Sequence, residues 1–222
     1  MVDTLELYAL YDEPFDDDAQ LTVYQRLLEL DEFECSTPPA ELRRQLATDE
    51  DVFLTAAFRS VHLSLVFGSS VPGLPKFPHL LVSIEGTEFE HPSLSADERA
   101  TKIDDLFEFV RLLYLHSSAA GYSPRYLIGA GPTHIDHLRR DTDFLRTTTG
   151  GVRSEELEEL YWLQLLPPTF AESVGYDRIQ RSPAPRLVEL EDGGIIFTAH
   201  EHPLEFADDY LRMLDHFGLN RS

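Results

Sequence analysis

The chain of 222 residues contains very little cysteine, very little lysine and no long apolar run. Cys35 is the only cysteine, which excludes a disulfide within the chain and a zinc site built from several cysteines. No stretch reaches the roughly 18 apolar residues of a transmembrane helix. The first residues also lack the basic and apolar regions of a secretory signal. We therefore expect a cytoplasmic protein without membrane contact.

Lysine occurs only at Lys76 and Lys102, whereas arginine occurs sixteen times and Asp plus Glu forty times. The formal net charge of −22 argues against a protein that coats DNA or RNA, because the bulk charge repels phosphates. Abundant Asp and Glu with almost no Lys resembles the proteins of salt-accumulating haloarchaea. In molar salt the Debye length falls to about 3 Å, which screens repulsion between surface carboxylates. The acidity then reflects habitat; the alternative is an acidic surface that docks a basic partner.

The charge is concentrated near the N-terminus. Residues 1–51 hold 15 acids and 3 bases, a net charge of −12. Residues 125–153 run against this trend, with five Arg and three Asp. Arg side chains kept together bind a carboxylate or phosphate bidentately, or else pair with the chain's own acids. The five arginines of this segment are Arg125, Arg139, Arg140, Arg146 and Arg153.

Apolar and polar residues alternate in several short segments, which is typical of strands. In residues 61–67 the apolar side chains face one way, while His62 and Ser64 face the other. Glu191-Asp192-Gly193-Gly194 lies between two apolar runs and predicts a hairpin. The other strands are predicted at residues 5–11, 52–59, 80–84, 125–128, 186–190 and 195–199.

The clearest predicted helix covers about residues 95–116, because Ser95 and Glu98 form a capping box ahead of apolar residues at helical spacing. Residues 161–166 fit either a strand or a helix. The last predicted helix begins near Pro203 and is expected to bury Ala207, Tyr210, Leu211 and Leu214. The other helices are predicted over about residues 16–28, 38–46, 134–140, 154–159 and 167–175.

Hairpins lie among the helices without a repeated βαβ order. This order predicts an α+β protein with a mostly antiparallel sheet and helices packed on its face. No internal repeat and no shift in composition marks a boundary, so a single domain over residues 1–222 is expected.

Two pairs of histidines are candidate metal ligands. His134 and His137 stand at i and i+3 of a predicted helix, so both rings could reach one ion; the alternative is a polar helix face. His200 and His202 would share one face of a strand, but a capping turn ahead of Pro203 is the favoured interpretation. Neither pair alone is a specific signal.

Gly129-Ala130-Gly131 follows a predicted strand and precedes a predicted helix, as a phosphate-binding loop would. The third glycine of a dinucleotide fingerprint and a Gly-Lys-Ser/Thr sequence are both missing, so a turn is favoured.

Aromatic residues in or beside predicted loops are candidates for anchoring a protein partner. Tyr161 and Trp162 are the preferred pair, and Tyr122 and Tyr126 are further candidates. The alternative is that these rings fill the core under long loops.

The C-terminal half has a distinctive order of features. Gly121-Tyr122-Ser123-Pro124-Arg125-Tyr126 follows the long helix, Tyr161-Trp162-Leu163-Gln164-Leu165-Leu166-Pro167-Pro168 precedes a short one, and Asp192-Gly193-Gly194 leads through an apolar strand to the last helix. Over about residues 105–218 this layout is similar to that of the fifty-second immunity-protein family of polymorphic toxin systems. The resemblance implies a cytoplasmic α+β protein that neutralises a toxin by binding it, and it carries no catalytic residue across.

We therefore expect a non-enzymatic interaction protein, immunity- or antitoxin-like, that binds a protein partner and needs no cofactor. One alternative is a metal-dependent hydrolase that uses His134 and His137. The other is a binder of small anionic ligands at Gly129 and Gly131, assisted by Arg125, Arg139 and Arg140.

Overall fold

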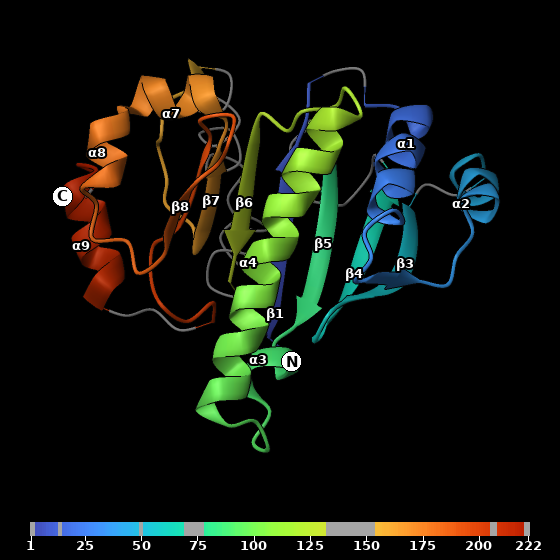
Figure 1. Ribbon diagram of the computed structural model, residues 1–222, viewed down its shortest axis with the longest axis horizontal. Helices are drawn as coiled ribbons and strands as arrows, with labels where there is room; N and C mark the ends of the chain where they lie inside the picture. The colour runs from blue at the N-terminus through green and yellow to red at the C-terminus, as the bar shows by residue number, and fades with distance from the viewer. Residues whose placement is uncertain are drawn as a thin grey trace. The chain divides into compact units, whose positions relative to one another are not determined.

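A computed structural model of the protein describes residues 3–12, 15–48, 51–68, 78–131, 154–204 and 208–219. The chain packs into two compact units (Figure 1). Unit 1 comprises Met1–Val71 and Pro78–Pro124; unit 2 comprises Pro72–Phe77 and Arg125–Ser222. Both units combine helices with antiparallel strands, which confirms the predicted α+β class. The single domain over residues 1–222 stays a prediction.

Unit 1 is built on five antiparallel strands in the order β2-β3-β4-β5-β1. The side chains of β3 alternate between buried and accessible, as the sequence pattern predicts, whereas β1 is buried on both faces from Leu5 to Leu10. We call the face of the sheet that carries Phe53 and Thr55 the outer face. The strands are β1 (Thr4–Leu10), β2 (Phe33–Cys35), β3 (Asp51–Phe58), β4 (Val61–Gly68) and β5 (His79–Glu85).

Helices cover the core face of this sheet. The longest, α4 (Ala96–Ala119), contacts β3, β4 and α1, and Figure 1 shows it running along the sheet. Its N-terminus has the predicted capping box between Ser95 and Glu98. Phe109 of α4 packs on the rings of Phe33 and Phe58, at centroid distances of 6.1 and 5.5 Å. The other helices of the unit are α1 (Asp17–Leu27), α2 (Pro39–Leu46) and α3 (Thr87–Glu90).

Unit 2 has four antiparallel strands in the order β6-β7-β9-β8. Every residue of β6, β7 and β9 is buried, so these strands are covered on both faces. The elements are β6 (Tyr126–Ala130), β7 (Leu163–Leu166), α7 (Pro168–Val174), α8 (Tyr176–Gln180), β8 (Leu187–Glu189), β9 (Ile195–Thr198) and α9 (Asp208–His216).

Several local predictions need correction. Residues 163–166 form a strand, which resolves the ambiguity over 161–166, and the helix predicted over 154–159 is wrong because residues 156–160 form no regular element. Leu211 of α9 is 60% exposed rather than buried, and Met213 is the helix residue that fills the core. No sequence pattern predicted the short elements β2, α3 and α8. The helix predicted over 134–140 lies outside the described residues.

Candidate functional site

The strand register builds a row of polar side chains across the outer face of unit 1. Thr55 lies opposite Ser64, Ser64 opposite Ser83, and Ser83 opposite Glu6. Directly opposed residues of antiparallel strands have Cβ atoms about 5 Å apart, so the members of this row are neighbours. Accessibility falls along the row from the exposed Thr55 to the buried Glu6, whose carboxylate accepts a hydrogen bond from the Tyr8 hydroxyl.

A hollow of about 480 Å³ opens over the accessible end of this row. Its volume lies within the usual range of ligand pockets, about 300–1,000 Å³. Its lining comes from β1, β3, β4, β5 and α3, and consists almost entirely of side chains with hydroxyl, carboxylate or imidazole groups. The residues are Thr4, Thr55, His62, Leu63, Ser64, Ser83, Glu85 and Glu88.

Glu88 of α3 is the most constrained member of the hollow. Its Oε2 accepts hydrogen bonds from the Lys102 ammonium at 2.6 Å and from the His62 backbone N–H at 3.2 Å, while Oε1 lies 3.2 Å from His62 Nδ1. Burial raises the pKa of the Glu88 carboxyl, but the hydrogen bonds from Lys102 and His62 outweigh burial and hold the pKa below its ordinary value. Glu88 is therefore ionised at neutral pH.

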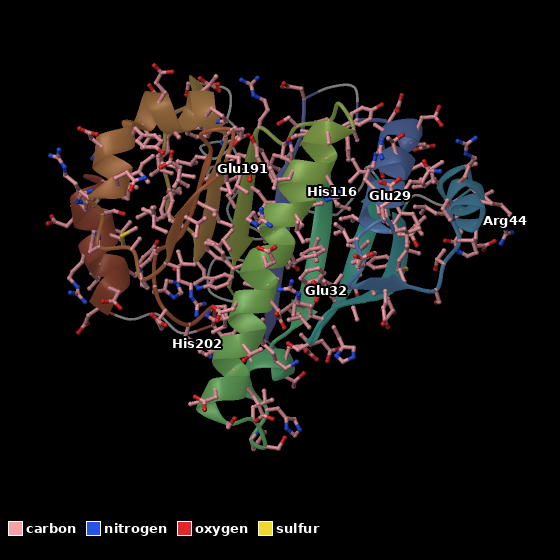
Figure 2. The ribbon with its side chains drawn as sticks, in the orientation of Figure 1. Glu29, Glu32, Arg44, His116, Glu191 and His202 are labelled. Atoms are coloured by element: carbon pink, nitrogen blue, oxygen red, sulfur yellow. The ribbon has the colours of Figure 1, made fainter. Side chains whose placement is uncertain are left out.

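The turn between β3 and β4 fixes this arrangement to α4. The Ser60 hydroxyl donates to Asp105 Oδ2 at 2.6 Å, and Lys102, one turn before Asp105 on α4, donates to the Ser60 carbonyl. Arg59 adopts a left-handed backbone, φ +49°, and its Nε donates to Glu32 at 2.7 Å; Glu32 is labelled in Figure 2. The turn thus holds Lys102 beside Glu88.

An apolar row runs next to the polar one. Phe53 lies opposite Val66, Val66 opposite Leu81, and Leu81 opposite Tyr8. Three of these side chains are buried, but the Phe53 ring is 71% exposed, the highest exposure of any large hydrophobic side chain in the described part of the chain. The outer face therefore presents an accessible aromatic ring two residues from the floor of a polar hollow.

Three of the four predicted aromatic anchors are wrong, because Tyr126, Tyr161 and Trp162 lie in the core of unit 2. Tyr161 and Trp162 have no exposed surface, and the Trp162 indole donates to the His200 carbonyl at 3.1 Å. Tyr126 is 3% exposed and packs on Phe170. A buried ring offers no contact surface to a partner. Tyr122 is half-buried, so its role as an anchor stays a prediction.

The candidate anion site is only partly described. Gly129 lies inside β6, opposite Leu163, and a Cβ on Gly131 would meet the Pro203 carbonyl oxygen at 2.5 Å. A side chain at position 131 would clash with this backbone oxygen, so close packing explains the glycine. Arg125 lies 3.5 Å from Glu155, which agrees with the alternative that this Arg pairs with an acid of the chain. Arg139 and Arg140 lie outside the described residues.

The metal prediction has the same limit, since His134 and His137 fall outside the described residues. The second pair forms a turn: His200 Nδ1 lies 2.7 Å from the His202 carbonyl oxygen, and His202 Nδ1 accepts from the Leu204 N–H at 3.3 Å. Burial lowers the pKa of His200, which favours its neutral form. Among the residues that the structure describes, no group of three or more His, Cys, Asp or Glu could hold a metal ion.

No model of a known protein family matches the chain, and no curated protein matches it either. None of the helices in the described ranges combines the length and apolar character that crossing a membrane requires.

The sequence contained one signal for the hollow. The alternation in residues 52–59 and 61–67 puts Thr55, His62 and Ser64 on the accessible face. Nothing local indicated that β5 and β1 would add Ser83, Glu85 and Thr4 to the same floor, or that α3 would place Glu88 at its side.

Proposed function

We propose that this protein acts by binding a partner protein, which docks on the outer face of unit 1 around Phe53 and the polar hollow. The observation that carries the proposal is the 71% exposed ring of Phe53 beside that hollow. Burying such a ring in a complex contributes about 2–3 kcal/mol, which is the size of an interface hot spot.

The edge of the sheet supports docking at this place. β2 pairs only with Ala56, Ala57 and Phe58 of β3. In the ranges that the structure describes, no strand pairs with the outer edge of β3 between Val52 and Thr55. This edge of β3 thus has no neighbouring strand in the described ranges, although α2 also contacts β3. A partner can approach the exposed Phe53 from the outer face.

The charge of the chain indicates which partner it selects. Residues 1–51, which include β1 and β2, carry a net charge of −12, so a partner with a basic surface is complementary. In a salt-rich cytoplasm this attraction is screened and the contact with Phe53 contributes most of the affinity. The resemblance of residues 105–218 to immunity proteins makes a toxin the partner we propose.

The test compares two variants that each remove one exposed hydrophobic side chain. Phe53→Ser changes the proposed docking face, and Leu211→Ser, on the 60% exposed Leu211 of α9, is the matched control in unit 2. The immobilised chains are offered the proteins of the source organism at its native salt concentration, and a retained protein is then purified and titrated.

We expect one protein to bind the unmodified chain and Leu211→Ser alike, and to bind Phe53→Ser more weakly by about tenfold or more. Equal affinity for all three chains would exclude this face as the docking site.

A further inference from the structure

We propose that the polar hollow of unit 1 receives an arginine side chain of the docked partner. The proposal rests on the proposed function for the source of the arginine, but the hollow's preference for a guanidinium group is a property of this chain alone.

The side chains that line the hollow are rich in hydrogen-bond acceptors. Glu85 of β5 and Glu88 of α3 contribute carboxylate oxygens, and hydroxyl oxygens come from each of β1, β3, β4 and β5. A guanidinium group carries five N–H donors and no acceptor, so it can satisfy several of these oxygens together. The hydroxyls belong to Thr4, Thr55, Ser64 and Ser83.

The local charge also selects a cation. Lys102 pairs with Glu88 at 2.6 Å and balances its charge. The carboxylate of Glu85 is then the remaining negative charge of the lining. One monovalent cation balances the site, whereas a phosphate or carboxylate would be repelled. A neutral polyol would leave the charge of Glu85 uncompensated.

The shape favours arginine over lysine. The His62 side chain is 75% exposed at the rim, and a flat imidazole can stack on a planar guanidinium group but not on a compact ammonium. Phe53 precedes Thr55 of the floor by two residues, which is about 7 Å along the strand. A partner seated on the Phe53 ring can therefore extend one long side chain into the hollow.

The test uses a small probe and no partner. N-acetyl-argininamide is titrated into the ¹⁵N-labelled full chain, with N-acetyl-citrullinamide as the neutral probe of the same shape. We expect the amide signals of Thr55, Ser64 and Ser83 to shift with the arginine probe only. Glu85→Gln should weaken this binding by about fivefold, and Glu90→Gln, which removes the same charge outside the hollow, should leave it unchanged.

A second variant tests the hollow without changing its charge. Ser64→Val fills the floor of the hollow with a side chain that suits a strand, and it should abolish the shifts while the variant stays folded. Equal shifts with citrulline, or arginine shifts that persist in both Glu85→Gln and Ser64→Val, would overturn the proposal.

The outcome is separable from that of the docking experiment. Specific arginine binding together with full partner affinity in Phe53→Ser would retain the hollow and reject the docking face. A loss of partner affinity in Phe53→Ser without any arginine binding would retain the docking face and reject the arginine site.

Discussion

At the scale of single residues, Glu88 links three parts of unit 1. Its carboxylate joins α3 to Lys102 of α4 and to His62 of β4, and it forms one side of the hollow. An ionised carboxylate that is partly removed from water is stable only while such partners are present. Glu88 thus contributes to the fold and to the negative charge of the site.

The pH dependence of stability tests this role. The pKa of Glu88 is lower in the folded chain than its ordinary value, so its stabilising contribution is present above the ordinary carboxyl pKa and is lost as the pH falls through the folded-state pKa. Glu88→Gln should lower the free energy of unfolding at pH 7 by about 1–3 kcal/mol and flatten the acid limb of the stability profile.

The measurement is denaturant unfolding between pH 3 and pH 7, with Glu90→Gln as the control for loss of one acidic charge on the same helix. Identical pH profiles for the two variants would show that the Lys102 and His62 contacts do not stabilise Glu88.

For single residues, the sequence predicted which face of a strand a side chain occupies, but it did not predict which aromatic rings are exposed. The alternation of β4 correctly predicted that His62 faces away from Leu63 and Leu65. Tyr161 and Trp162 were expected to be accessible because they adjoin a loop, yet both are buried by tertiary packing that no local pattern encodes.

At the scale of elements, local signals predicted most of the helices and strands. The capping box located the start of α4, and the glycines at 193 and 194 correctly predicted the β8–β9 hairpin. The pairing of β1 with β5 joins residues 69 to 81 positions apart in the chain, from Leu10↔His79 to Thr4↔Glu85, and a two-fold side-chain period does not encode such a partner. The floor of the hollow depends on that pairing.

The packing at the end of β6 predicts that position 131 does not tolerate a side chain. Gly131 follows this strand, and a Cβ there would lie 2.5 Å from the backbone oxygen of Pro203. Gly131→Ala should therefore shift the turn that contains Pro203 and lower the free energy of unfolding by about 1–3 kcal/mol. Thermal unfolding with and without inorganic phosphate measures this effect.

The control is Gly121→Ala, where φ is +88° but no atom lies within 4 Å of the added Cβ. That substitution costs only the backbone strain of about 1 kcal/mol. A stable Gly131→Ala chain that loses stabilisation by phosphate would instead support the anionic-ligand site and contradict the packing role.

At the scale of the whole molecule, the net charge of −22 is the dominant physical property. Several ion pairs are exposed and local, such as Arg44 with Glu41 on α2, where Arg44 extends from the surface in Figure 2. Exposed pairs of this kind contribute little. We therefore expect repulsion among the excess carboxylates to be relieved mainly by salt in the solvent.

Salt should accordingly stabilise the fold. Between about 0.2 and 2 M KCl the Debye length falls from roughly 7 to 2 Å, and we expect the Tm to rise by roughly 10 °C. Calorimetry in KCl, compared with sucrose at equal osmolality, separates screening from solvent exclusion. A Tm that rises equally in sucrose would attribute the effect to exclusion rather than to charge.

We propose that a partner protein binds the outer face of unit 1. Hydrogen–deuterium exchange of the full chain, with and without the purified partner, tests it most directly. We expect protection on binding to cover residues 51–58 and 61–68, which form β3 and β4. Protection confined to residues 168–180 and 208–216 of unit 2, with β3 and β4 unchanged, would contradict it.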